Sequence, residues 1–132
     1  IFSFIEKFGA ATFFETTTPN LFGKYSKENQ YHIINSLITD NANQPAASLV
    51  AYYHAMMERP NLTGVLKTTT LPVLFILGTE DIAVALDDTL PQTKLPKSAY
   101  LYVLENCGHM GMLEQPTAFN NAILDFLDKV NA

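Results

Sequence analysis

The 132-residue chain contains one cysteine, Cys107, few basic residues and no long apolar run. A single cysteine excludes an intrachain disulfide and fits a reducing compartment, so we expect a cytoplasmic protein. Lysine and arginine number 8 against 13 acidic residues, the net charge is −5, and no basic cluster occurs. Nucleic acid and anionic membrane surfaces therefore do not fit as partners.

The longest apolar stretch, residues 72–77, is much shorter than the roughly 20 residues that a membrane-spanning helix needs. No signal-peptide pattern opens the chain. The chain instead begins without methionine, inside the periodic apolar segment IFSFIEKF, and we interpret it as a piece of a longer protein. Its hydrophobic content of 48% is enough for one compact core.

The first half of the chain has the pattern of a helical segment. Apolar residues recur at helical spacing up to the β-branched and proline stop TTTPN, residues 16–20. A second helix is predicted over about residues 27–39, with Ser26 as its N-cap. A third helix is predicted to follow Pro45 and to end before the loop that Pro60 marks.

The character of the sequence changes after Thr70. Residues 72–78, PVLFILG, form a continuous apolar run ended by glycine, which is typical of a strand buried on both faces. A short helix or irregular crossover leads to a second predicted strand, residues 99–104. An amphipathic helix with Pro116 at its first position follows. This order of elements predicts a parallel α/β sheet.

The loops that follow the two predicted strands carry residues suited to acid–base chemistry. The first, LGTEDIAV, contains Asp81, and the second, ENCGHMG, contains His109. Because functional groups gather at the carboxyl ends of parallel strands, we expect the Asp81 carboxylate near hydrogen-bonding distance of a His109 ring nitrogen. Such a carboxylate fixes the imidazole tautomer and leaves the other nitrogen free to take a proton. Gly108 and Gly111 are expected to give this loop unusual backbone angles.

Simpler roles are open for the same residues. Asp81 could cap the helix that follows it, Glu80 is a rival carboxylate, and His109 could bond only within its own loop. We interpret Cys107 as a buried, inert thiol rather than a reactive one. No metal site is expected, because the three histidines lie far apart and no His-x-x-x-His or Cys-x-x-Cys spacing occurs.

Two apolar groups in the helical half could line a substrate pocket, but packing among the helices is the preferred interpretation for both. One group is His54 with its neighbours Tyr52, Tyr53, Met56 and Met57. The other is the set of phenylalanines Phe2, Phe4, Phe8, Phe13 and Phe14.

The order of these motifs makes the chain resemble the C-terminal portion of the α/β-hydrolase family. The family places its catalytic acid in a Gly-x-x-Asp turn after a strand, which matches Gly78 to Asp81. It places its catalytic histidine in a Gly-His turn before a Glu-x-Pro helix start, which matches His109 and the segment from Glu114 to Pro116. The resemblance covers residues 60–130 well, and the part before it looks like the helical cap of the family.

The resemblance implies a fold class and roles for two residues. The fold is a partial parallel sheet, the C-terminal piece of a hydrolase core, preceded by a helical cap segment; we place the cap in residues 1–66 and the core part in residues 67–132. His109 would be the general base and Asp81 the acid that orients it. No cofactor and no metal are implied, because this chemistry needs none.

The chain departs from the family pattern in what it lacks. The nucleophile elbow Gly-x-Ser-x-Gly and the His-Gly oxyanion loop are absent. None of the five serines is flanked by glycines in the required pattern: Ser3, Ser26, Ser36, Ser48 and Ser98. In the family the nucleophile precedes the acid and the histidine, so we expect the missing parts upstream of Ile1.

Two functions follow from this comparison. The first is a parent hydrolase that acts on an ester, a lactone or a similar small apolar substrate, with a nucleophile that is Ser, Asp or Cys and with this chain inactive by itself. The alternative is a non-catalytic relative that acts as a binding or assembly module. With only two recognisable strands, the isolated chain should also associate as a homodimer or larger assembly through residues 1–16 and 72–77.

Overall fold

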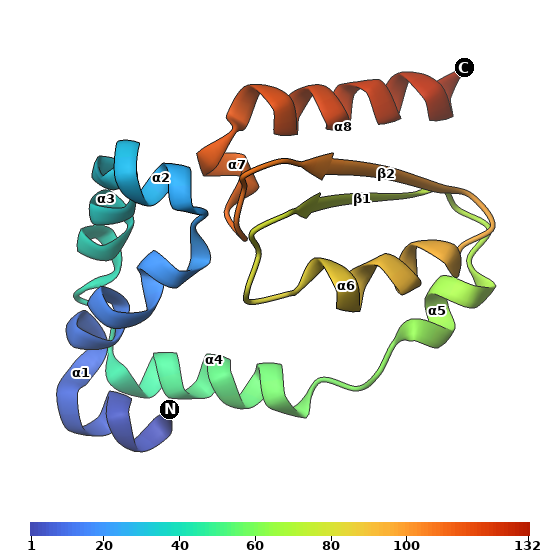
Figure 1. The fold of residues 1–132 in the computed structure, drawn as a ribbon. Coiled ribbons are helices and arrows are strands. Elements are labelled where there is room, and N and C mark those ends of the chain that lie inside the picture. The colour runs from blue at the N-terminus through green and yellow to red at the C-terminus, as the bar shows by residue number, and fades with distance from the viewer.

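The computed structural model describes all 132 residues and shows a helical first half followed by a βαβα unit (Figure 1). The first half contains α1 (Phe2–Thr17), the 3-10 helix η1 (Thr18–Leu21), α2 (Lys24–Asn29), α3 (Tyr31–Asn41), α4 (Ala46–Glu58) and α5 (Thr63–Thr68). The second half contains β1 (Val73–Gly78), α6 (Leu86–Thr89), η2 (Leu90–Lys94), β2 (Ala99–Leu104), α7 (Gly111–Glu114) and α8 (Pro116–Asn131).

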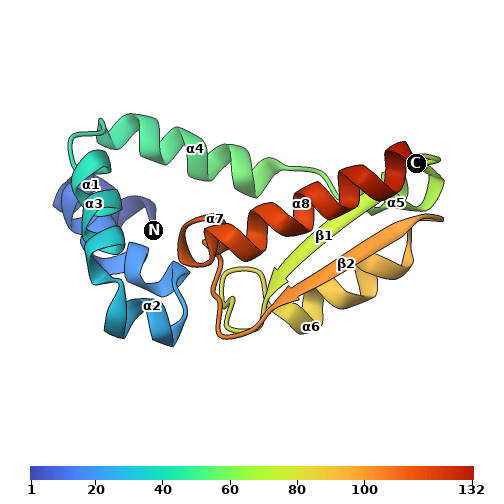
Figure 2. The same cartoon turned by 90° about the horizontal axis from the view of Figure 1, so that it is seen from above.

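The two predicted strands are confirmed and pair in parallel. Val73 lies opposite Ala99, and Gly78 lies opposite Leu104, so the strands end level with each other. The long helix α8 covers one face of the sheet and α6 lies against the other (Figures 1 and 2). The prediction that β1 is buried on both faces is wrong for this chain. Residues 73–77 are only half-buried, because β1 has a neighbouring strand on one side only.

The helical half differs from the prediction at its second helix. In place of one helix over residues 27–39, the chain forms α2 and α3, which meet at Gln30. Gln30 has φ −127° and ψ 29°, so it interrupts the helical path. Ser26 is not an N-cap, because it lies inside α2, where its hydroxyl bonds to the side chains of Gln30 and Glu114. The predicted helix after Pro45 is present as α4.

Two small clusters hold the helical half together. Ile5, Phe13 and Leu49 pack α1 against α4. A second cluster centres on Phe22 and Ile34, and side chains from the region of α7 pack against it as well. The second cluster therefore joins the helical half to the chain segment that follows β2.

The boundary of the two halves lies in a short connection. Helix α5 ends at Thr68 and β1 begins at Val73, while the assignment of residues 1–66 to a cap stays a prediction. None of the helices combines the length and apolar character that crossing a membrane requires.

Candidate active site

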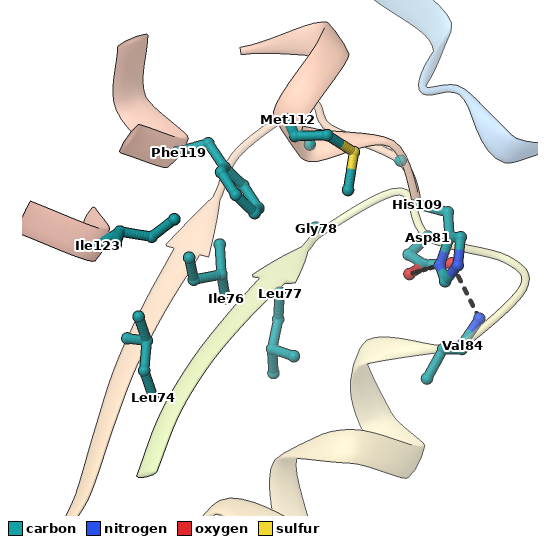
Figure 3. Close-up of a pocket in the computed structure, with 12 residues that line it drawn as sticks. Leu74, Ile76, Leu77, Gly78, Asp81, Val84, His109, Met112, Phe119 and Ile123 are labelled. Carbon is teal, nitrogen blue, oxygen red and sulfur yellow. Dashed lines mark hydrogen bonds and ion pairs between the residues drawn. The ribbon is translucent and has the colours of Figure 1, made fainter. Parts of the chain in front are cut away.

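The loops that follow β1 and β2 bring Asp81 and His109 into direct contact. His109 Nδ1 lies 2.8 Å from Asp81 Oδ2, so the predicted contact is confirmed (Figure 3). The level ends of the parallel strands explain it, because both loops leave the sheet at the same edge. The Asp81 side chain is 12% exposed and that of His109 is 41% exposed, so the carboxylate is sheltered while the ring reaches outward.

The other oxygen of Asp81 is fixed by the turn in which it lies. Oδ1 accepts the backbone N–H groups of Ala83 and Val84, both at 2.9 Å. Asp81 therefore caps its own turn and not α6, which begins at Leu86 with no side-chain cap. The two donors hold the carboxylate in one orientation and leave Oδ2 for the imidazole. A carboxylate only accepts, so His109 donates its Nδ1–H, and in the neutral ring Nε2 is then the acceptor.

A pocket of about 490 Å³ lies beside this pair, within the size range of small-molecule sites. Leu74 and Ile76 reach it from one face of β1 and Leu77 from the other, so the pocket wraps around the unpaired edge of that strand. Its lining contains no serine, threonine or cysteine and consists of Leu74, Ile76, Leu77, Gly78, Asp81, Val84, Gly108, His109, Gly111, Met112, Phe119 and Ile123 (Figure 3).

The rival carboxylate, Glu80, points elsewhere. Its Oε2 accepts the backbone N–H of Lys24 at the start of α2. Its own N–H donates to the carbonyl of Cys107 at 2.8 Å, which ties the two loops together. Glu80 therefore joins the loops to the helical half, and Asp81 is the residue that contacts the histidine.

A buried carboxylate lies behind the histidine loop. Glu114 is 4% exposed, and its Oε1 accepts the N–H of Gly108 at 2.9 Å. Its Oε2 accepts the N–H of Gly23 at 2.8 Å and the hydroxyl of Ser26 at 2.9 Å. From the sequence, Glu114 was identified only as part of a helix-start motif; its three donors could not be foreseen, because two of them come from a segment about 90 residues away.

The glycines of the site serve close packing. The expectation of unusual backbone angles at Gly108 and Gly111 is wrong, since the only glycine with positive φ is Gly9 in α1. A Cβ on Gly108 would lie 2.6 Å from the backbone nitrogen of Gly23, and one on Gly78 would overlap the carbonyl oxygens of Gly108 and Cys107. The backbone at Gly108 thus touches the backbone at Gly78 and at Gly23, and these contacts leave no room for a side chain.

The remaining candidates lie outside the pocket. Cys107 is fully buried, as predicted. His54 stacks on Phe2 with a ring separation of 4.2 Å and does not line the pocket. Of the phenylalanines, Phe13 is buried in the helical core, whereas Phe8 is 49% exposed. No three His, Cys, Asp or Glu side chains gather in an arrangement that could hold a metal ion.

Comparisons with known proteins extend this description. The chain matches the Ndr family over residues 3–130. A 2-hydroxy-6-oxononadienedioate/2-hydroxy-6-oxononatrienedioate hydrolase from a Pseudomonas species is 36% identical to it over 69 residues, which is 52% of this chain and 24% of that protein.

Solved structures share its fold. A thermophilic esterase from Thermogutta terrifontis superposes with a TM-score of 0.89 at 22% identity, over 99% of this chain and 48% of the esterase. The enol-lactonase from Burkholderia xenovorans LB400 gives a TM-score of 0.83 at 19% identity, over 96% of this chain and 48% of the lactonase. The chain thus spans about half the length of these structures and about a quarter of the Pseudomonas hydrolase. It belongs to the Ndr family and has the fold of the C-terminal portion of an α/β-hydrolase.

Proposed function

We propose that the chain supplies the acid and the general base of an α/β-hydrolase whose nucleophile lies outside these 132 residues. The whole protein would hydrolyse an ester, a lactone or a similar small apolar substrate. The observation that carries this proposal is the 2.8 Å contact between His109 Nδ1 and Asp81 Oδ2 beside an apolar pocket. The hydrolase, esterase and lactonase activities named for its relatives support it.

In this proposal the two residues have separate roles. His109 takes the proton of the nucleophile on Nε2 and later gives it to the leaving group, while Asp81 stabilises the imidazolium that forms in between. The backbone donors at Ala83 and Val84 keep the carboxylate in place through both steps. Residues 1–66 would act as the cap over this chemistry, and residues 67–132 would form the C-terminal part of the core.

The pocket lining suggests the chemical class of the substrate. The pocket lining contains one carboxylate, Asp81. It contains no lysine or arginine that could hold an anionic group. The apolar side chains in the lining include Met112 and Val84, whose backbone N–H bonds to Asp81. Such walls favour an uncharged, apolar acyl or alkyl group next to the reacting carbonyl.

The first prediction concerns the whole protein. His109→Ala should lower kcat/KM for p-nitrophenyl esters by about 10⁴-fold or more, and Asp81→Asn should lower it by about 10⁴-fold, because the base and its orienter act as a unit. Asp87→Asn is the matched control, since Asp87 is exposed on α6, outside the pocket lining, and should keep full activity.

Two outcomes would contradict the catalytic proposal. One is a whole protein that hydrolyses esters equally well without His109. The other is a coding sequence upstream of Ile1 that contains no nucleophile elbow, together with a whole protein that shows no hydrolysis. The second outcome would favour the non-catalytic binding or assembly module instead.

The second prediction concerns the chain by itself. Purified residues 1–132 should hydrolyse p-nitrophenyl esters no faster than their own His109→Ala variant. A positioned base without a nucleophile and without an oxyanion hole loses most of the rate enhancement. Hydrolysis that depends on His109 in the purified chain would show that the nucleophile lies within it.

The third prediction tests Cys107 as a nucleophile. Burial raises the pKa of its thiol from 9.0 to about 12, and the negative charge of Glu114 adds to the shift. The thiolate is the reactive form, so the native thiol should resist a disulfide reagent near pH 8 and react once the chain is unfolded. Rapid labelling of the native chain would contradict this.

The raised pKa of Cys107 also predicts a dependence of stability on pH. Between pH 9.0 and about 12, the folded state keeps a thiol proton that the unfolded state releases. The free energy of unfolding should therefore fall as pH rises through this range.

The fourth prediction concerns association of the isolated chain. We propose that it forms a homodimer or larger assembly through its sheet, because β1 and β2 each have an unpaired edge. Residues 72–77 are half-buried, and the exposed large apolar side chains of the sheet are Leu101 and Val103, at 42% and 40%. Sedimentation should detect the assembly at micromolar concentration.

Substitution of both exposed residues by lysine should shift the assembly toward monomer, since charges on the sheet face oppose burial there. The double change Asn35→Lys and Ser36→Lys, an equal change of charge on the exposed surface of α3, should leave it intact. A monomer in the unaltered chain would refute self-association.

A further inference from the structure

We propose that Glu114 is a positioning residue. Through its hydrogen bonds, the position of the His109 ring depends on residues 21–26 of the helical half. The role of His109 in catalysis rests on the proposed function above. The dependence itself rests only on contacts in the structure. The helical half would then hold the histidine loop in position in addition to covering the site.

The first link is the Glu114 carboxylate. It is buried and accepts three hydrogen bonds, from Gly108 on one oxygen and from Gly23 and Ser26 on the other. Hydrogen bonds to a charged acceptor are about twice as strong as neutral ones, and no water competes for them at this depth. Gly108 is the residue next to His109, so the carboxylate connects the peptide before the histidine to the start of α2.

The second link is direct. The backbone N–H of His109 donates to the carbonyl of Leu21 at 2.8 Å. Two consecutive N–H groups of the histidine loop are therefore held by the 21–26 segment, one directly and one through Glu114. The two segments are closely packed, because a Cβ on Gly23 would lie 2.9 Å from the carbonyl oxygen of Asn106 and 3.1 Å from the nitrogen of Gly108.

Asp81 has a different anchor. Its carboxylate is oriented by the turn after β1, through Ala83 and Val84, which belong to the sheet half. Glu80 joins that turn to Lys24, so the helical half also touches this side, but through a separate side chain. A displacement of residues 21–26 would therefore move the His109 backbone while the Asp81 carboxylate keeps its own turn donors, and the contact between the His109 ring and the Asp81 carboxylate would change.

Glutamine cannot replace Glu114 here, for a geometric reason. Both carboxylate oxygens face a backbone N–H, one at Gly108 and one at Gly23. The amide of glutamine has one acceptor and one donor, so in either orientation its NH₂ group meets an N–H that has lost its acceptor. Glu114→Gln thus breaks one of the two connections while changing the size of the side chain very little.

The test is the state of the His109 ring, measured by ¹⁵N NMR on residues 1–132 near pH 8. In the unaltered chain the ring should be mainly the Nδ1–H tautomer, because Asp81 accepts that proton. In Glu114→Gln and in Gly23→Ala the two ring nitrogen shifts should move toward each other, as the Asp81 contact loosens and the other tautomer gains population.

Two controls match these changes. Glu105→Gln removes an exposed carboxylate from the same loop, and Gly64→Ala adds a methyl group in α5 where no atom lies within 4 Å. Both should leave the ring signals unchanged. If either test variant fails to fold by circular dichroism, Ser26→Ala, which removes one hydrogen bond from Glu114, takes its place with a smaller shift in the same direction.

Folded test variants whose ring nitrogen shifts equal those of the unaltered chain would overturn the proposal. Ring signals that move equally in the controls would overturn it too, since the effect would not be specific to the connection. The readout needs no hydrolysis. A failure here leaves the catalytic proposal standing, and an inactive whole protein leaves this result unaffected.

Discussion

The parallel pairing of β1 with β2 is the constraint on which the candidate site depends. Because Gly78 lies opposite Leu104, the chain leaves both strands at the same level and in the same direction. Asp81 and His109 follow at three and five residues from those ends, close enough for a direct hydrogen bond. A shift of the pairing by one residue would turn every side chain of one strand to the other face and would displace one loop along the sheet.

Close backbone contact between three segments fixes the positions of the loops that follow the strands. The loop after β1, the histidine loop and the segment before α2 meet at Gly78, Gly108 and Gly23, where no Cβ would fit. Such proximity places backbone donors beside one another, and burial makes each of them costly to leave without an acceptor. Glu114 meets that requirement with a single side chain, which explains why a carboxylate can be buried in this position without a basic partner.

The helical half and the candidate site are packed against each other. The phenyl and isoleucine side chains of the second helical cluster pack against the region of α7, where Glu114 lies, so the helical half contributes to the fold of the histidine loop. The relatives have the same fold over nearly the whole of this chain, although identity is about a fifth. A fold can persist at that identity because burial pattern and backbone hydrogen bonds, more than particular side chains, maintain it.

The sequence by itself determined the two strands and the final helix with Pro116 at its start, because periodicity is a local signal. It also predicted the contact of Asp81 with His109, since both residues follow strands expected to be parallel. Only the tertiary structure decided the break between α2 and α3, the half-exposed state of β1, and the roles of Ser26, Glu80 and Glu114. Those features depend on contacts between residues far apart in the chain. A local pattern carries no information about which distant donor a buried carboxylate will meet.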